Sequence, residues 1–254
     1  MGLRMIRAGL AIALVAPAAW PGAAAAAPVS FAHGTIDNRM TATRTNAATG
    51  SSFTGSYHAA GDPSAPPPYM RKMVFYAPPG QRFDTSVPER CSATDAELEA
   101  RGGAACPAGS RIGGGTVEGS FLGFPTKLDV ESYNAADAMI MVASSPGLYT
   151  VMRGHIAPDQ SVEWTSPTCF PSAQPAPCPV DDALQLASTV TVPARTRADG
   201  GIVRSYMTTA PSCPKSGHWN ATVRLWWADG TTDTVLTPQP CTRPARQRVK
   251  HKRR

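Results

Sequence analysis

Several short motifs of common enzymes and metal proteins are missing from this sequence. It has no H-E-x-x-H pair, no C-x-x-C pair and no G-K-S/T phosphate-binding loop. Its histidines are not spaced to act as ligands together with its cysteines, so we expect no metal site and no cofactor. Because no catalytic constellation can be recognised, no catalytic residue is named and we expect a protein that is not an enzyme.

Long apolar runs are also scarce, and the longest lies near the N-terminus at residues 8–20. A short stretch with two arginines precedes it at residues 4–7, and an A-x-A sequence follows at Ala24 and Ala26. This order is typical of a secretory signal peptide, and the run is shorter than the roughly 20 residues that span a bilayer. We therefore expect residues 1–26 to be a Sec-type signal peptide. The mature protein should be secreted or associated with the cell envelope, without a transmembrane span.

Basic residues are concentrated at the C-terminus, where residues 243–254 contain seven lysines and arginines and no acid. These seven are Arg243, Arg246, Arg248, Lys250, Lys252, Arg253 and Arg254. The body, residues 27–242, has 15 basic against 18 acidic residues, which argues against a specific nucleic-acid-binding face. We expect residues 243–254 to form a disordered tail. This tail either aids solubility or contacts anionic cell-envelope polymers.

Six cysteines follow the expected signal peptide, and an even number in an exported protein favours disulfide bonds. Six cysteines allow 15 pairings. Neighbouring cysteines bracket self-contained local units, so we expect nearest neighbours to pair. The expected pairs are Cys91 with Cys106, Cys169 with Cys178, and Cys213 with Cys241.

The body contains many turn residues, and the whole chain has 25 prolines and 22 glycines. The clearest strand is residues 219–227, WNATVRLWW, which alternates apolar and other residues and precedes the hairpin signal Asp229-Gly230. A second hairpin is expected to join residues 188–194 and 202–209, and further short strands follow the same pattern. We expect a single all-β domain over residues 27–242, an antiparallel β-sandwich or jelly roll of about ten strands.

One short helix is expected at residues 95–101. Thr94 and Glu97 have the spacing of a capping box, in which each side chain bonds the backbone N–H of the other residue. Gly102 is a natural C-terminal stop.

The segment that begins MVFYAPPGQRF and runs to IGGGTV, residues 73–117, combines a P-P-G turn, V-P-x-C, a short helix and C-P-x-x-S-x-I-G. It resembles a segment of uncharacterised exported proteins from high-GC Gram-positive bacteria. The matching positions are Pro78, Pro79, Gly80, Val87, Pro88, Cys91, Cys106, Pro107, Ser110, Ile112 and Gly113. The resemblance implies a β-sandwich and implies no activity.

Trp226 is the residue that most suggests a ligand. By alternation it should face outward beside Asn220, Thr222 and Arg224, where it could stack on a sugar or pack under a loop. We therefore expect a non-enzymatic exported protein that acts at the cell surface or envelope. A carbohydrate-binding module is the alternative, and a jelly-roll hydrolase is the second alternative, for which Glu131 and Glu163 fall on or near expected strands.

Overall fold

The computed structural model describes residues 27–121, 123–146, 148–166 and 183–243. The expected signal peptide, the pair Cys169 and Cys178, and the tail beyond Arg243 lie outside the described residues. Within the described part, no helix is long and apolar enough to cross a membrane.

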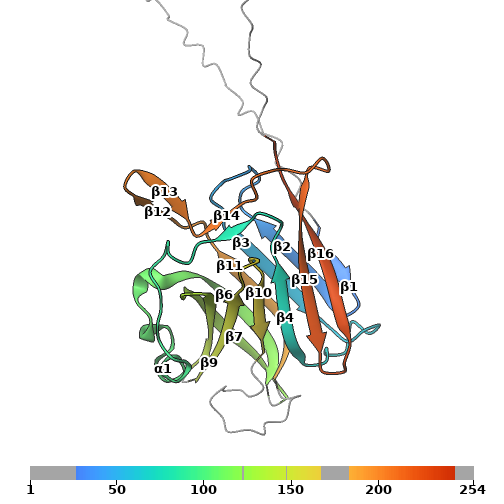
Figure 1. The fold of residues 1–254 in the computed structure, drawn as a ribbon. Coiled ribbons are helices and arrows are strands. Elements are labelled where there is room, and N and C mark those ends of the chain that lie inside the picture. The colour runs from blue at the N-terminus through green and yellow to red at the C-terminus, as the bar shows by residue number, and fades with distance from the viewer. Residues whose placement is uncertain (1–26, 122, 147, 167–182, 244–254) are drawn as a thin grey trace, which may run out of the picture.

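Most of the chain forms one twelve-stranded sheet in which all paired neighbours are antiparallel (Figure 1). In sheet order its strands are β1 (Val29–Phe31), β2 (Gly34–Met40), β3 (Ser51–Tyr57), β11 (Ala183–Val192), β6 (Arg111–Phe121), β7 (Phe124–Asn134), β8 (Ala138–Ser145), β9 (Leu148–Ile156), β10 (Val162–Thr165), β4 (Met70–Tyr76), β15 (His218–Trp227) and β16 (Thr232–Pro240).

The sheet curls into a nearly closed barrel, because its last strand, β16, lies against β1 and β2 at the other end of the order. The expected sandwich of about ten strands is therefore wrong. Alternating burial shows that one face of each strand is covered, but it does not show whether the covering strands belong to a second sheet or to the same one. A twisted sheet of more than about ten strands tends to curl. Here the sheet curls so far that its own strands cover its inner face.

The barrel closes along the line where β16 meets β2, which we call the seam. Side chains of β16 form hydrogen bonds across it. The Met40 N–H donates to Gln239 Oε1 at 2.9 Å, and Gln239 Nε2 donates to the Asn38 carbonyl oxygen. Near the other end of β16, His33 Nδ1 lies 2.6 Å from Asp233 Oδ2. Buried side chains thus replace part of the backbone ladder at the seam.

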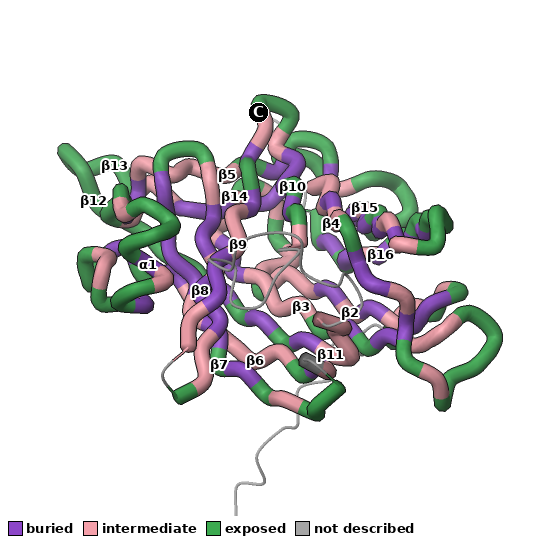
Figure 2. Tube along the Cα trace, turned by 90° about the horizontal axis from the view of Figure 1, so that it is seen from below, coloured by how far each residue is buried: buried purple, intermediate pink, exposed green. Residues whose placement is uncertain are grey.

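The inner face of the barrel follows the period-two pattern of the strands. Along β15, residues 219, 221, 223, 225 and 227 are buried, which confirms the alternation expected for WNATVRLWW. The hairpin to β16 is also confirmed, with Gly230 in the left-handed region at φ 85°. In Figure 2, buried stretches occur on strands far apart in the sheet order, such as β8 and β16, because both contribute to the interior and β8 is also covered on its outer face by α1.

The second expected hairpin is wrong in its pairing. Residues 188–192 belong to β11, which pairs with β3 and β6. Two small extra sheets form instead. The first joins β12 (Thr196–Asp199) to β13 (Ile202–Ser205), and the second joins β5 (Arg82–Phe83) to β14 (Met207–Thr208).

The helix α1 (Asp95–Arg101) forms where the sequence predicts it, and the Thr94–Glu97 capping box is present. Leu98 is fully buried against the outer face of the barrel, in a cluster with Tyr133, Ile140 and Val142. Two single-turn helices follow, η1 (Gly102–Ala105) and η2 (Ala108–Ser110).

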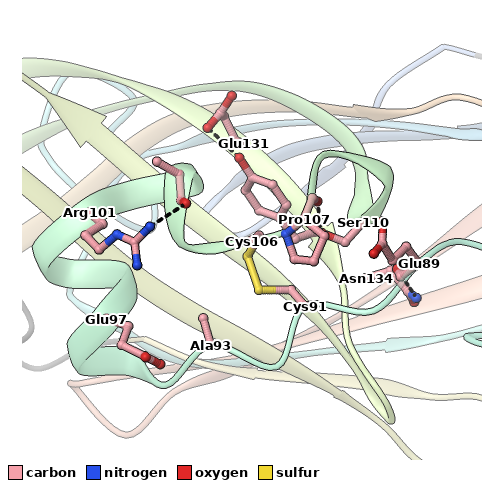
Figure 3. The surroundings of a disulfide bond; sticks show 12 residues. Glu89, Cys91, Ala93, Glu97, Arg101, Cys106, Pro107, Ser110, Glu131 and Asn134 are labelled. Carbon is pink, nitrogen blue, oxygen red and sulfur yellow. Dashed lines mark hydrogen bonds between the residues drawn. A yellow bond between two sulfur atoms is a disulfide. The ribbon is translucent and has the colours of Figure 1, made fainter.

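Two of the expected disulfides are present, Cys91–Cys106 and Cys213–Cys241. The first ties the segment before α1 to the end of η1 and lies over the barrel close to Glu131 and Asn134 (Figure 3). The second joins the loop before β15 to the residue after β16, and so closes the open end of that hairpin.

Candidate binding cavity

A cavity of about 120 Å³ lies in the interior of the barrel. Its lining residues come from the inner faces of strands all around the sheet, and from the loop between β4 and β5. The register of the strands explains this convergence, because Phe53 pairs with Val190, Phe75 with Val162, and Met141 with Met152. Each pair therefore presents two side chains to the same interior.

Methionine dominates the lining. Six of the seven methionines after residue 26 border the cavity. They are Met40, Met73, Met139, Met141, Met152 and Met207. The methionine side chain is unbranched, flexible and polarisable, so it fills irregular cores and also adapts to ligands of varied shape. A methionine stripe by itself indicates only a core, but these methionines border space that protein atoms leave open.

Aromatic rings complete the apolar part of the wall. They are Phe53, Phe75, Phe83 and Trp164. Trp164 is 6% exposed, so its ring lies in the interior of the barrel. The cavity is therefore an apolar environment, and the transfer of a small apolar molecule from water into it would be favourable.

The polar lining is neutral. Among the described residues, the cavity is lined by no Asp, Glu, Lys, Arg or His. Its polar members are asparagine, glutamine and serine side chains. Two of these, Asn38 and Gln239, belong to the seam, where Gln239 uses both ends of its amide on the backbone of β2.

Gln81 differs from Gln239 in its hydrogen bonding. It is 4% exposed, and its Oε1 atom is buried without a hydrogen-bond partner among the described residues. Buried acceptors are nearly always satisfied in proteins, so an unsatisfied one needs an explanation. The P-P-G turn holds Gln81 in place, because Gly80 adopts φ 85° and the Gln81 N–H donates to the Pro78 carbonyl oxygen at 3.0 Å.

An outer depression of about 290 Å³ lies next to this turn, lined by residues 77–83 and 158–160. Pro78, Gln81 and Phe83 line both the depression and the cavity. The Phe83 N–H donates to Gln160 Oε1 at 2.6 Å, which joins the two segments of the depression. Gln81 therefore stands between the outside of the barrel and its interior.

Trp226 lies away from the cavity, on the outer face of β15. It is half-buried, with Lys72 Nζ 4.5 Å and Arg224 Cζ 5.0 Å from the centroid of its ring. The outward direction expected from alternation is confirmed, and the two cationic side chains cover part of the ring. Of the seven basic tail residues, the structure describes Arg243, which is exposed.

The two carboxylates considered for a hydrolase do not form a pair. Glu131 on β7 bonds Arg111 at 3.1 Å, and Glu163 on β10 bonds Lys72 at 3.4 Å. Strands β8 and β9 lie between β7 and β10 in the sheet, a spacing of roughly 14 Å at about 4.8 Å per strand. That exceeds the roughly 5–9.5 Å between the carboxyl groups of glycosidases. No group of three or more His, Cys, Asp or Glu in the described part of the chain is placed to hold a metal ion.

The fold and the cavity together define a class: an antiparallel barrel with an apolar, neutral interior space. No family model, curated protein or solved structure matches this chain. The expected membership among exported proteins of high-GC Gram-positive bacteria stays a prediction.

Sequence reasoning missed the cavity and Gln81 altogether. The methionines are spread from residue 40 to residue 207, and no sequence window contains more than a few of them. The P-P-G turn can be recognised in the sequence, but nothing in its residue types indicates that the next residue carries an unsatisfied acceptor.

Proposed function

We propose that this protein binds a small apolar molecule inside its barrel. The observation that carries the proposal is the open interior space bordered by six methionines and four aromatic rings. For scale, an apolar cavity of about 150 Å³ engineered into another protein binds benzene. A space of about 120 Å³ therefore suits a compact apolar group, and methionine side chains can rotate to admit a larger one.

This proposal fits the expected export of the chain, because an exported protein can sequester or carry an apolar compound that water dissolves poorly. It is favoured over the carbohydrate-binding alternative, because the residue expected to stack on a sugar, Trp226, lies outside the cavity with Lys72 and Arg224 over its ring. The envelope contact expected of residues 243–254 is a separate proposal that neither supports nor opposes the cavity.

Toluene is a direct probe, and thermal unfolding of the mature protein with its disulfides intact is the readout. At a free concentration of five times Kd, a ligand that binds only the folded state stabilises it by about 1 kcal/mol. For a protein of this size, that raises Tm by about 2–4 °C.

A cavity-filling variant provides the test of location. Val117 lines the cavity, so Val117→Phe should abolish the shift caused by toluene. Val203→Phe is the matched control, because Val203 is 68% exposed on β13 and should leave the shift unchanged. Absence of any shift in the unaltered protein, or an equal shift in Val117→Phe, would refute binding in the barrel.

A further inference from the structure

We infer that the ligand of this cavity is uncharged and carries a hydrogen-bond donor, such as a phenolic or alcoholic hydroxyl, that Gln81 Oε1 accepts. This inference rests on the proposed function and names the chemical class of the ligand. It follows from two independent features, the neutral wall and the unsatisfied acceptor of Gln81. The Ser188 hydroxyl on β11 also lines the cavity without a hydrogen-bond partner among the described residues, but a hydroxyl can donate as well as accept, so of the two only Gln81 Oε1 requires a donor on the ligand.

The neutral wall excludes a charged ligand. A carboxylate or an ammonium group buried in the cavity would meet no opposite charge, since the described lining has neither acids nor bases. Moving an ionised group from water into such surroundings costs far more than the burial of a small apolar body returns. A fatty acid or an amine is therefore a poor ligand for this site.

The acceptor at Gln81 selects among neutral ligands. A ligand hydroxyl that donates to Gln81 Oε1 would satisfy the buried acceptor and its own donor in one bond. Gln239, the other buried glutamine of the wall, is not available for this purpose, because its amide already bonds Met40 and Asn38. The bond to Gln81 therefore distinguishes a hydroxyl compound from a hydrocarbon of the same shape.

The location of Gln81 also orients the ligand. Gln81 stands beside the outer depression, and methionines such as Met141 and Met152 lie on strands β8 and β9 inside the barrel. The hydroxyl end should therefore face the depression, with the apolar body among the methionines.

Four para-substituted toluenes test the inference in the unaltered protein, with its disulfides intact and at neutral pH. They are p-xylene, with neither donor nor acceptor; p-cresol, with a hydroxyl; 4-methylanisole, with an acceptor only; and p-toluate, with a negative charge. Calorimetric or NMR titration should give p-cresol a Kd about 3- to 10-fold below that of p-xylene. It should show no binding of p-toluate, and 4-methylanisole should bind no better than p-xylene.

Gln81→Met tests the assigned residue, because it keeps an unbranched side chain and removes the acceptor. In this variant the p-cresol Kd should rise at least 10-fold, while the p-xylene Kd should change by less than 2-fold. Gln185→Met is the matched control, because Gln185 also lines the cavity and makes no side-chain hydrogen bond to a described residue. It should preserve the preference for p-cresol.

The outcomes separate this inference from the proposed function. If no uncharged probe binds, the proposed function fails. If p-xylene binds but p-cresol binds no better, or p-toluate or 4-methylanisole binds best, the cavity binds ligands and the inference about their class is wrong. If Gln185→Met abolishes the preference for p-cresol and Gln81→Met does not, the acceptor has been assigned to the wrong residue.

Discussion

Replacing Gln239 by leucine should destabilise the barrel at its seam. Backbone groups of alternate residues in a strand point to alternate neighbours. The Thr41 N–H bonds the Gly50 carbonyl oxygen on the β3 side, so the Met40 N–H and the Asn38 carbonyl oxygen point away from β3, towards β16. Strand β1 pairs with β2 only over residues 34–36, and the Gln239 amide satisfies these two groups beyond that point.

The expected loss follows from these contacts. Leucine has nearly the volume of glutamine, so the substitution leaves no large void and mainly removes the two hydrogen bonds. Gln239 is 1% exposed, so water cannot replace it without local opening. Each buried backbone group left unsatisfied costs about 1–3 kcal/mol. We expect a decrease of about 3 kcal/mol in the free energy of unfolding, or about 6–12 °C in Tm for a protein of this size.

Two measurements would test this reasoning. Denaturant unfolding with the disulfides intact gives the free energy, and native-state hydrogen exchange gives the protection of the Met40 amide, which should fall more than that of Val223 in the middle of β15. Gln185→Leu is the control, because it removes a lining glutamine that has no side-chain hydrogen bond to a described residue. A loss below 1 kcal/mol in Gln239→Leu, or unchanged exchange at Met40, would show that Gln239 does not hold the seam.

Four further predictions concern other parts of the chain. Replacing Cys91 and Cys106 together by serine should lower the free energy of unfolding by about 3 kcal/mol and reduce the hydrogen-exchange protection of α1. The affinity for toluene should not change, and a large loss of affinity would contradict the placement of this bridge outside the barrel. Burial raises the pKa of Tyr57 to about 12, so the folded protein holds this proton more tightly than the unfolded chain, whose tyrosines titrate near pH 10. The resulting stability, roughly 2–3 kcal/mol, should be present below pH 10 and disappear as pH rises from 10 towards 12. Burial also raises the pKa of Tyr69 to about 12, so the ultraviolet titration is compared with that of Tyr57→Phe. The difference between the two should show ionisation only in that range, and a difference near pH 10 without unfolding would refute the prediction. Trp226→Ala should lower stability by no more than about 1 kcal/mol, the usual strength of exposed cation–π contacts, and leave the toluene Kd unchanged, so a shift in that Kd would show that the outer face influences the cavity. Deleting residues 243–254 should remove salt-sensitive binding to purified cell envelope, which in the full chain should vanish at about 0.5 M salt; binding that survives both changes would mean that the barrel carries the contact.

The features that could be predicted from the sequence are those with local causes. Period-two alternation in residues 219–227 and the Asp229-Gly230 turn lie within one hairpin, and the structure confirms both. The capping box at Thr94 acts over three residues, and the two confirmed disulfides close loops of 15 and 28 residues. In each case the residues that decide the structure are close together in the sequence.

The partners of β11 show where local reasoning fails. Its alternation predicts a half-buried strand, and the turn at Gly200 suggests that residues 202–209 pair with it. The structure instead places β11 between β3 and β6, whose sequences are more than 60 residues away. The glycine-rich start of β6 helps to make this possible, because a Cβ on Gly115 would overlap the Thr189 carbonyl oxygen of β11. Sequence alone does not indicate which strand needs that close approach.

Closure of the barrel and formation of the cavity have the same physical origin. Met40 lines the cavity, and its backbone N–H bonds Gln239, which also lines the cavity. One wall of the proposed binding site is therefore the seam itself. If the seam opened, the cavity would lose this wall and water would reach the methionines, so a ligand that needs the enclosed space would bind the closed barrel preferentially. Ligand binding and barrel closure should therefore stabilise each other. Neither can be recognised from a single stretch of the sequence, because both depend on contacts between β2 and β16, at opposite ends of the described chain.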